Sequence, residues 1–254
     1  MSGSLVVVGL GPGSARYLTP SAAEAIAGAT DLIGYSVYLD RISQANAAQT
    51  RHGSGNRVEI DRARHALMLA AEGRHVAVVS GGDPGVFAMA AAVFEAIEAG
   101  DPSWRQIDVR VEPGITAMLA AAAEVGAPLG GDFCAISLSD NLKSWETIER
   151  RLSAAADGDF VIALYNPAST ARPHQIKRAF DLLREKKSPE TVVLLVRNAA
   201  MPDVRVVTTS LTDVDTSLVD MRTLVIIGAS ATRLLTRDNR SPWVYTPRAE
   251  RGRP

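Results

Sequence analysis

Cysteine is almost missing from the sequence, with Cys134 as the one thiol among 254 residues. A single cysteine excludes an intramolecular disulfide and fits a reducing compartment. An excess of charge is also missing, because 27 Lys and Arg residues stand against 28 Asp and Glu residues, for a net charge of -1. This balance argues against binding of nucleic acid by the whole surface.

Long hydrophobic runs are lacking as well. The longest, residues 117–125, contains Glu124 and falls well short of the roughly 18 residues that a membrane span needs. The first residues, MSGSLVVVGLGPG, have no positively charged segment, and glycine interrupts their apolar stretch, so we expect no signal peptide. With 46% hydrophobic and 22% charged residues, the composition favours a globular cytoplasmic protein with no membrane partner.

Short β-branched segments alternate with Ala-rich segments along the whole chain. This alternation predicts α/β architecture in both halves, with a mixed sheet in the second half, where several strands follow each other with little helix between. The predicted strands are residues 5–8, 32–33, 75–79, 107–111, 133–137, 160–164, 191–196, 204–208 and 224–227. The predicted helices are residues 19–27, 61–72, 86–99, 116–125, 145–156 and 173–186, with Thr19 and Asp61 as expected N-caps.

The first glycine loop, VVVGLGPG at residues 6–13, follows a predicted strand and precedes a helix. Such a loop lets the backbone approach a ligand closely. Ser14 stands where a dinucleotide fingerprint needs its third glycine, and Asp31 lies at the start of the second strand rather than at its end. No lysine precedes Lys143, which excludes a phosphate-binding P-loop here. On its own the loop fits a plain tight turn equally well.

Two further loops follow the same strand, loop, helix order. In SGGDPGVF at residues 80–87, Gly81 and Gly82 expose the backbone, and Asp83 is expected either to cap the next helix or to fix the loop for a ligand. In EPGITAMLAAAA at residues 112–123, Thr116 and Ala117 are small. The carboxyl ends of the strands of a doubly wound sheet lie at one edge, where ligands bind. Three small-residue loops without a lysine suit a zwitterionic nucleoside such as S-adenosylmethionine.

Together these segments resemble the tetrapyrrole methyltransferases of the cobalamin pathway. The three loops are followed by ALYNP at residues 163–167 and VRNA at 196–199, in the order typical of that family. The resemblance covers residues 4–228. It implies an N-terminal α/β domain with a mostly parallel sheet and the substrate trough, residues 1–115, and a C-terminal α/β domain with a mixed sheet, residues 116–232. It also implies a cofactor cleft between them, and an Arg-rich tail, residues 233–254, is expected to be solvated.

Three longer stretches resemble the branch that methylates precorrin-3B at carbon 17 and contracts the macrocycle to precorrin-4. They are GYSVYLDRI at residues 34–42, SLSDNLKSWETIERRL at 137–152 and ALYNPASTAR at 163–172. The resemblance implies S-adenosylmethionine as cofactor, S-adenosylhomocysteine as product, a tetrapyrrole substrate and a homodimer. Arg197-Asn198 departs from the glycine-arginine pair that the family pattern leads us to expect.

Carried over by position, the implied cofactor contacts lie in the glycine loops of the first half and at strand ends of the second. They are Pro12, Gly81, Gly82, Asp83, Val86, Thr116, Ala117, Leu164, Tyr165, Asn166, Asn198, Ala199 and Thr223. Ring contraction needs an acid or base, and the candidates are Asp83, Tyr35, Tyr38, Ser139 and Asp140. Each of these also has a structural interpretation as a cap or a packing residue.

The substrate of this family carries many carboxylates, so cationic side chains are expected at the trough. The candidate substrate contacts are Gly11, Tyr38, Lys143, Arg172 and Arg197. We expect no metal, because the four histidines include no ligand pair with zinc-site spacing.

Four alternatives stay open. They are methylation of another precorrin carbon, a family branch that methylates RNA or protein, a nucleotide-dependent oxidoreductase and a non-catalytic tetrapyrrole carrier. The near-neutral charge disfavours RNA, while Ser14 and the position of Asp31 disfavour the oxidoreductase. A carrier would not need three small-residue loops.

Overall fold

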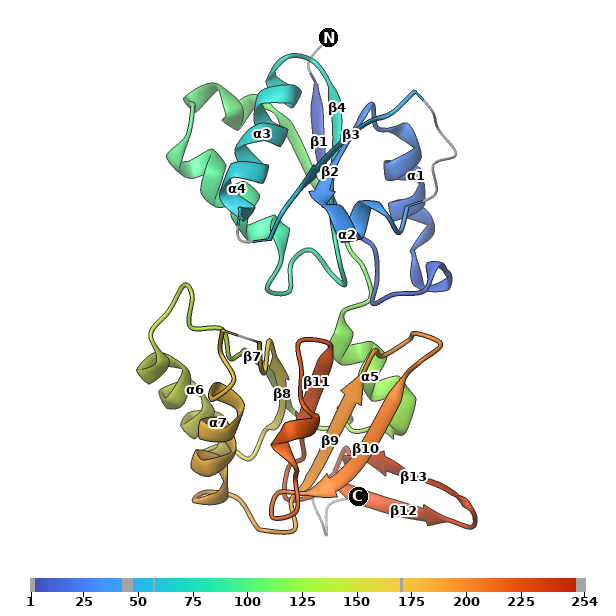
Figure 1. Ribbon diagram of the computed structural model, residues 1–254, viewed down its shortest axis with the longest axis vertical. Coiled ribbons are helices and arrows are strands. Elements are labelled where there is room, and N and C mark those ends of the chain that lie inside the picture. The colour runs from blue at the N-terminus through green and yellow to red at the C-terminus, as the bar shows by residue number, and fades with distance from the viewer. Residues whose placement is uncertain (1–2, 43–47, 57, 170, 250–254) are drawn as a thin grey trace. The chain divides into compact units, whose positions relative to one another are not determined.

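The computed structural model describes residues 3–42, 48–56, 58–169 and 171–249 (Figure 1). The chain divides into two compact units, Met1–Ala117 and Met118–Pro254, which we call unit 1 and unit 2. This division falls two residues after the domain boundary that we expect from the sequence. Thr170, which belongs to one of the resemblance segments, and residues 250–254 of the expected tail lie outside the described residues.

Unit 1 is built on a five-stranded parallel sheet of order β3-β2-β4-β1-β5. Its strands are β1 (Ser4–Gly9), β2 (Asp31–Tyr35), β3 (Thr50–Ser54), β4 (His75–Ser80) and β5 (Asp108–Glu112). The central strands are nearly continuous apolar runs, as expected where helices cover both faces of a parallel sheet. All five strands run in one direction, so their carboxyl ends share one edge.

Helices cover both faces of this sheet (Figure 1). Side chains of α3 (Glu59–Ala71) and α4 (Met89–Ala99) pack with Leu5, Val7 and Val78 on one face. Side chains of α1 (Pro20–Gly28) and α2 (Ser36–Leu39) pack with Val8 and Val79 on the other. The predicted cap of α1 is confirmed, because Thr19 accepts a hydrogen bond from the Ala22 amide. The sheet is thereby held as the middle layer of three.

Unit 2 contains a mixed sheet of order β10-β9-β11-β8-β7, as expected from the sequence. Only β7 (Phe133–Ser137) and β8 (Val161–Tyr165) are parallel, whereas β11 (Thr223–Ile227), β9 (Val192–Arg197) and β10 (Arg205–Ser210) pair antiparallel. As a result, the ends of β7, β8 and β9 lie at the same edge as the start of β11. The register places Leu164 opposite Val225 and Arg197 opposite Thr223.

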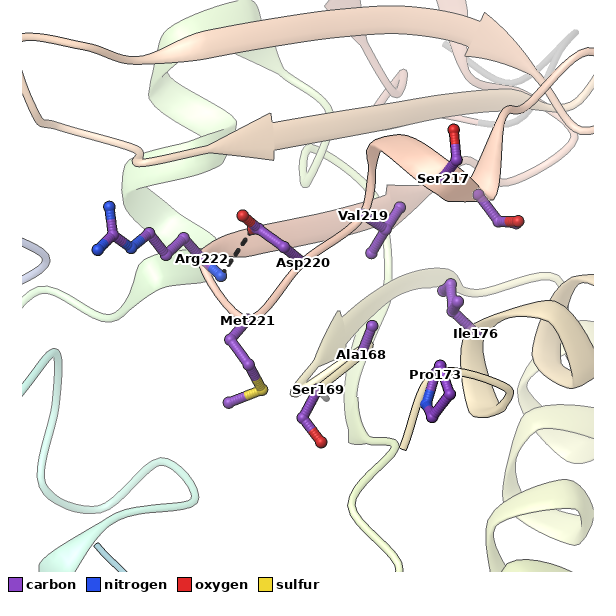
Figure 2. A pocket seen from close by; sticks show the side chains of 10 residues that line it. Ala168, Ser169, Pro173, Ile176, Ser217, Val219, Asp220, Met221 and Arg222 are labelled. Carbon is purple, nitrogen blue, oxygen red and sulfur yellow. Dashed lines mark hydrogen bonds between the residues drawn. The ribbon is translucent and has the colours of Figure 1, made fainter. Parts of the chain in front are cut away.

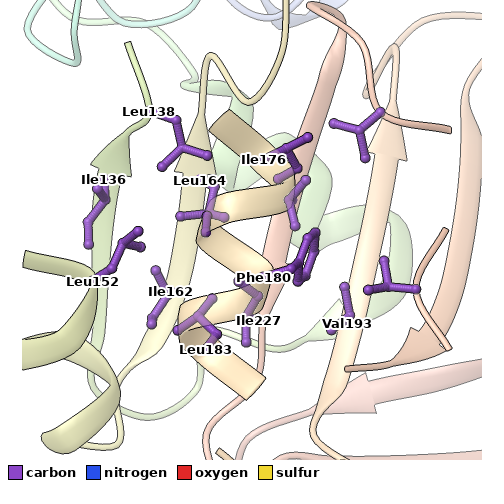
Figure 3. Close-up of a cluster of buried hydrophobic side chains, with 14 of the residues drawn as sticks. Ile136, Leu138, Leu152, Ile162, Leu164, Ile176, Phe180, Leu183, Val193 and Ile227 are labelled. Atoms are coloured by element: carbon purple, nitrogen blue, oxygen red, sulfur yellow. The ribbon is translucent and has the colours of Figure 1, made fainter. Parts of the chain in front are cut away.

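Helices α6 (Trp145–Asp157) and α7 (Gln175–Arg184) cover one face of the mixed sheet, and α5 (Ala117–Val125) lies on the other (Figures 1 and 3). Phe180 of α7 is fully buried against Leu183, Ile162 and Ile227. Ser144 caps α6 by accepting from the Thr147 amide. Ser139 and Asp140 therefore lie in the loop before the helix and do not form its N-terminus.

The tail is mostly exposed, as expected, but for most of its length it is not an unstructured end. Residues 233–245 form the hairpin of β12 (Arg233–Arg237) and β13 (Arg240–Tyr245), and β13 pairs with the short strand β6 (Gly126–Ala127). Buried Val244 lies at that pairing, and Thr246 Oγ1 donates to the Pro128 carbonyl oxygen at 2.6 Å. Strand pairing thus anchors a segment whose arginines suggested only solvation.

Among the described residues, the sequence pattern also misses the short elements β3, α2 and β6, the expected cap Asp61 is wrong, and of the two roles left open for Asp83 the cap is excluded. Helix α3 begins at Glu59 after Val58, which places Asp61 inside its first turn. Helix α4 begins at Met89, six residues after Asp83, so Asp83 is not its cap. Within the described part of the chain, no helix combines the length and the apolar character needed to cross a membrane.

Candidate active site

The first two glycine loops of unit 1 are joined by a reciprocal pair of backbone hydrogen bonds. The Gly11 amide donates to the Gly82 carbonyl oxygen at 3.1 Å, and the Gly82 amide donates back to the Gly11 carbonyl oxygen at 2.9 Å. Both residues have a left-handed backbone, with φ of 69° and 68°. Glycine adopts this conformation without a steric penalty, which explains its use at both positions.

The third loop lies directly against the other two. A Cβ atom at Gly114 would come within 2.3 Å of the Gly82 carbonyl oxygen and 2.9 Å of the Gly9 Cα. No side chain fits there, so glycine is required for the three backbones to touch. The carboxyl ends of β1, β4 and β5 therefore meet in one closely packed backbone cluster, as the sequence predicts.

Asp83 holds the second and third loops together. Its Oδ1 accepts from the Gly85 amide at 2.8 Å, and its Oδ2 accepts from the Gly114 amide at 3.0 Å. With one backbone N–H on each carboxylate oxygen, Asp83 fixes loop geometry. This contact set suits a positioning residue better than a proton-transferring one.

Tyr38 covers the second glycine loop from the side of α2. A Cβ atom at Gly81 would lie 2.7 Å from the Tyr38 Cζ, so the ring rests on the bare backbone. The Tyr35 ring meets Tyr38 edge-on, with centroids 5.5 Å apart. Arg41 Nη2 donates to the carbonyl oxygens of Gly11 at 3.2 Å and Gly13 at 3.0 Å.

The remaining candidates of unit 1 lie in the same three loops. Pro12 and Val86 are half-buried, and Thr116 is buried immediately before α5. The nearest atom to a Cβ built on Gly82 is the Thr116 Cα, at 3.8 Å. All candidates that the sequence assigns to unit 1 thus gather at the carboxyl edge of its parallel sheet.

The candidates of unit 2 gather at one edge of the mixed sheet. Tyr165 ends β8 and Asn166 follows it. Asn198 and Ala199 follow β9, and Thr223 opens β11. Asn166 Nδ2 donates to Ser137 Oγ at 3.0 Å, which connects β8 to the end of β7. Tyr165 Oη accepts from the Met118 amide at 3.0 Å. Leu164 differs from these, because its side chain is fully buried in the core.

Left-handed backbone conformations in residues other than glycine mark this edge. Asn166, Asn198 and Ala200 have φ of 51°, 54° and 64°, and Phe87 in the second loop of unit 1 has φ of 53°. Such residues store local strain of about 1–3 kcal/mol each and cluster at ligand-binding sites. The unexpected Asn198 is well suited to its place, because asparagine tolerates the left-handed region better than most residues.

Arg197 and Thr223 are joined through Asp220. Arg197 Nε donates to Asp220 Oδ2 at 2.8 Å, and Thr223 Oγ1 donates to Asp220 Oδ1 at 2.9 Å. Burial alone would raise the pKa of Asp220, but these hydrogen bonds outweigh it and hold the pKa below its usual value. The Arg197 charge is therefore already neutralised by a carboxylate.

A pocket of about 440 Å³ lies in unit 2 between the segment after β8 and the segment that leads into β11 (Figure 2). Ala168, Ile176 and Val219 give it an apolar floor, and Ser169 and Met221 lie at its side. Ser169 Oγ is buried and has no hydrogen-bond partner within the described chain. An apolar pocket with a polar group left to satisfy is typical of a small-molecule site.

Arg172 and Asp140 lie close together near this pocket. Arg172 Nε is 4.0 Å from Asp140 Oδ1, and Gln175 Nε2 donates to Asp140 Oδ2 at 3.0 Å. Arg172 Nη1 is 3.5 Å from the Asn166 carbonyl oxygen. Half-buried Lys143 lies in the loop after β7, where burial, together with the charge of Arg151, lowers its pKa.

Three of the four histidines, His52, His65 and His75, lie in unit 1, and His174 precedes α7 in unit 2. His52 and His65 meet edge-on, with centroids 4.9 Å apart, and His52 Nε2 lies 2.9 Å from Asp31 Oδ1. Across the described residues, no group of three His, Cys, Asp or Glu side chains is arranged to hold a metal ion. Asp31 also accepts from Arg74, so this carboxylate serves an ion-pair network at the start of β2.

Sequence reasoning missed Arg41, Arg62 and Asp220. Arg41 lies inside the quoted segment GYSVYLDRI, but its contact with the first glycine loop needs the folded chain. Arg62 could have been found from the sequence, because it is a charged residue among the buried positions of α3, next to Ala63. Asp220 lies in a turn whose sequence predicts exposure, so the sequence gives no reason to single it out.

In unit 1 the glycine backbones pack against one another and against Tyr38. In unit 2 the side-chain amides of Asn166 and Asn198 donate to Ser137 and Asp203. The described residues of these loops include no lysine of the kind that a polyphosphate requires.

Comparison with known proteins gives a consistent result. Residues 4–215 match the family model for tetrapyrrole (corrin/porphyrin) methylases. A relative from Sinorhizobium sp, a precorrin-3B C(17)-methyltransferase, is 54% identical over 248 residues, which covers 98% of this chain and 97% of the relative.

Two further matches extend this comparison. The cobalamin biosynthesis protein CobIJ of Mycobacterium tuberculosis is 48% identical, and this chain spans 48% of its length. The crystal structure of the methyltransferase CobJ superposes with a TM-score of 0.91 at 52% identity, covering 97% of this chain and all of that one.

Proposed function

The chain belongs to the tetrapyrrole (corrin/porphyrin) methylases, and from this premise we propose that it methylates carbon 17 of precorrin-3B and contracts the macrocycle to precorrin-4. It is a methyltransferase of cobalamin biosynthesis that uses S-adenosylmethionine. The observation that carries the choice of substrate is the end-to-end match with the Sinorhizobium enzyme, in which nearly all of both chains align.

S-adenosylmethionine supplies a methyl group activated by a positively charged sulfur. In unit 1, the residues that would hold it are Gly81, Gly82 and Thr116, through peptide groups that Asp83 keeps in place. In unit 2, they are Asn166, Asn198 and Thr223 at the edge of the mixed sheet. Leu164 would contribute only through its backbone, because its side chain is in the core.

Methyl transfer forms a bond between the methyl group and the ring carbon as the bond from methyl to sulfur breaks. The sulfur keeps the electron pair, and the macrocycle takes up the positive charge that the sulfur loses. This reaction needs in-line placement more than a strong base, and placement alone can supply roughly 7–11 kcal/mol at best. Rigid, mutually bonded glycine loops meet that need.

Ring contraction needs proton transfer near the substrate. Tyr35, Tyr38, Ser139 and Asp140 are our candidates. Asp140 lies beside Arg172 and Gln175, which would keep its carboxylate oriented. Asp83 is assigned to positioning, since both of its oxygens accept backbone hydrogen bonds.

We also infer a cytoplasmic homodimer. The hairpin β12–β13 exposes Leu234, Leu235 and Trp243 by 45%, 47% and 52% of their surfaces, and a second copy would cover them. The lone cysteine, Cys134, fits a reducing compartment. Light scattering on the full chain should give twice the 26.9 kDa chain mass. A monomer at micromolar concentration would contradict the dimer.

The test of the proposed activity is incubation of the purified protein with S-adenosylmethionine labelled in the methyl group and enzymatically prepared precorrin-3B. We expect label in the tetrapyrrole and one S-adenosylhomocysteine per methyl transferred. Transfer to a different precorrin, with none to precorrin-3B, would assign the chain to another branch of the family.

A further inference from the structure

A buried cation without a carboxylate partner lies at the carboxyl edge of the parallel sheet. Arg62 is 6% exposed, and it donates from Nε to Ser54 Oγ at 2.8 Å and from Nη2 to the Gly55 carbonyl oxygen at 2.6 Å. Its Nη1 faces the Met89 sulfur at 3.3 Å. All three acceptors are neutral, so the described residues leave the positive charge without a salt bridge.

Such an arrangement is costly unless a negative charge arrives from outside. Burying an ion without a counter-charge is strongly unfavourable. Burial lowers the pKa of Arg62, and the charges of Glu59 and Tyr38 act in the opposite direction. Glu59 is near enough to act electrostatically, but among the described contacts no carboxylate oxygen lies within 4.0 Å of this guanidinium.

A second arginine, Arg41, lies against the Tyr38 ring. The Arg41 guanidinium carbon lies 5.7 Å from the centre of the Tyr38 ring, and Arg41 remains exposed. Its Nη2 holds the first glycine loop through Gly11 and Gly13, whereas its Nε and Nη1 make no recorded bond to the described residues. Each of those two nitrogens can donate a single charge-assisted hydrogen bond to a carboxylate oxygen.

Other arginines of the candidate site differ from this pair. Arg172 lies 4.0 Å from Asp140, and Arg197 is hydrogen-bonded to Asp220 at 2.8 Å. Their charges already face carboxylates of the chain. Arg41 and Arg62 differ, because the described residues give neither of them a carboxylate partner. Tyr38 covers the bare backbone of Gly81 in this region.

We propose that Arg41 and Arg62 form the anchor for a carboxylate side chain of the tetrapyrrole. Arg41 contacts the carboxylate directly, and Arg62 supplies a fixed positive charge at the end of β3. This assignment rests on the proposed function and adds two residues to it. It makes unit 1 selective for a macrocycle with a free carboxylate over one in which that group is amidated.

The direct test is substitution of Arg41 by Gln and by Lys, with Arg64→Gln as the control. Arg64 is on the same helix as Arg62, is half exposed and pairs with Asp61 at the surface. We expect Arg41→Gln to raise KM for precorrin-3B at least about tenfold, with the dissociation constant of S-adenosylhomocysteine within about twofold. Arg41→Lys should recover part of the loss, and Arg64→Gln should change neither value.

Two results would overturn the anchor. One is an unchanged KM in Arg41→Gln. The other is an equal loss of S-adenosylhomocysteine binding, because Arg41 would then act only by holding the first glycine loop. Arg62→Gln should weaken tetrapyrrole binding in the same way, with Arg62→Lys intermediate. If thermal unfolding shows that Arg62→Gln does not fold, the Arg41 variants decide alone.

A binding experiment separates this inference from the proposed function. Cobyrinic acid, a stable corrin with free carboxylates, and its fully amidated analogue are titrated into the wild-type protein and Arg41→Gln. We expect the wild type to prefer the acid at least about tenfold and the variant to lose that preference. Preference without methylation of precorrin-3B would refute the activity and keep the anchor. Methylation of precorrin-3B without a preference for the acid would support the activity and refute the anchor.

Discussion

At the scale of single residues, Asp83 shows how a sequence interpretation changes once the loops are folded. An aspartate after two glycines and before a proline resembles a helix cap, yet α4 begins only at Met89. Its two oxygens instead join the second and third loops through Gly85 and Gly114. The sequence singles the residue out, but its contacts with the two loops appear only in the folded chain.

Asp83→Asn should weaken cofactor binding more than folding. The asparagine amide oxygen can still accept from Gly85, but the amide N–H would face the Gly114 N–H. The hydrogen bond that joins the third loop to residue 83 is therefore lost. We expect the S-adenosylhomocysteine dissociation constant to rise about tenfold in calorimetry. Asp101→Asn is the matched control, because Asp101 makes the same turn contact with the Ser103 amide, at 2.8 Å, and its hydrogen bonds stay within that turn. Equal S-adenosylhomocysteine dissociation constants for both variants would contradict a role of Asp83 in holding the third loop for the cofactor.

Asp31 carries a prediction about stability and pH. It is 1% exposed and accepts from Arg74 at 2.7 and 2.9 Å. Burial alone would raise the pKa of Asp31, but hydrogen bonds from Arg74, Thr30 and His52 outweigh it and lower the pKa. A lowered folded-state pKa stabilises the protein above the unfolded value, near pH 4, and that contribution disappears as pH falls through the folded value.

Asp31→Asn should therefore cost about 2 kcal/mol of unfolding free energy at neutral pH, and the difference from wild type should shrink in acid. Urea unfolding at about pH 7 and about pH 3 measures both effects. Asp108→Asn, at a solvent-exposed pair with Arg110, should cost less than about 0.5 kcal/mol. A gap that stays constant with pH would show that the pKa of Asp31 does not differ between the folded and unfolded states.

At the scale of elements, buried strands were the most predictable part of the chain. Continuous apolar runs that end at glycine or a polar residue locate β1, β4 and β8 to within one residue. Strand β3 was missed because its sequence, TRHGS, has no apolar pattern and pairs only because β2 lies beside it. The hairpin β12–β13 was missed for a related reason, since its arginines mask a pairing that depends on β6.

The site was predictable to a similar degree. Glycine spacing locates the three loops, because only glycine allows their backbones to touch. The ends of β8 and β9 follow from the resemblance of ALYNP and VRNA. Arg41 and Asp220 were not predictable, since their contacts join segments that only the folded chain brings together.

Helix α7 depends on one aromatic side chain. Phe180 is fully buried in the core of unit 2 (Figure 3). Phe180→Ala should cost about 3–5 kcal/mol, because it removes buried surface and leaves a cavity. Phe94→Ala on α4, where the ring is 51% exposed, should cost far less. Chemical denaturation of the two variants makes the comparison, and equal losses would contradict the core assignment.

At the scale of the whole molecule, each unit presents its candidate residues at one edge of a sheet. Unit 1 gathers glycine loops at the ends of parallel strands, and unit 2 gathers strained asparagines at the edge shared by β8, β9 and β11. These features fit a fold that binds a nucleoside cofactor and a macrocycle and does its chemistry by placement. The expected cofactor cleft remains a prediction.

The most direct measurement is the position of the transferred carbon. The protein is incubated with precorrin-3B and S-adenosylmethionine whose methyl carbon is carbon-13, and the product is analysed by mass spectrometry and carbon-13 NMR. We predict a mass increase of one methylene, a single labelled methyl on carbon 17 and an equal amount of S-adenosylhomocysteine. Label on another ring carbon, or no transfer by protein that binds S-adenosylhomocysteine normally, would contradict the account.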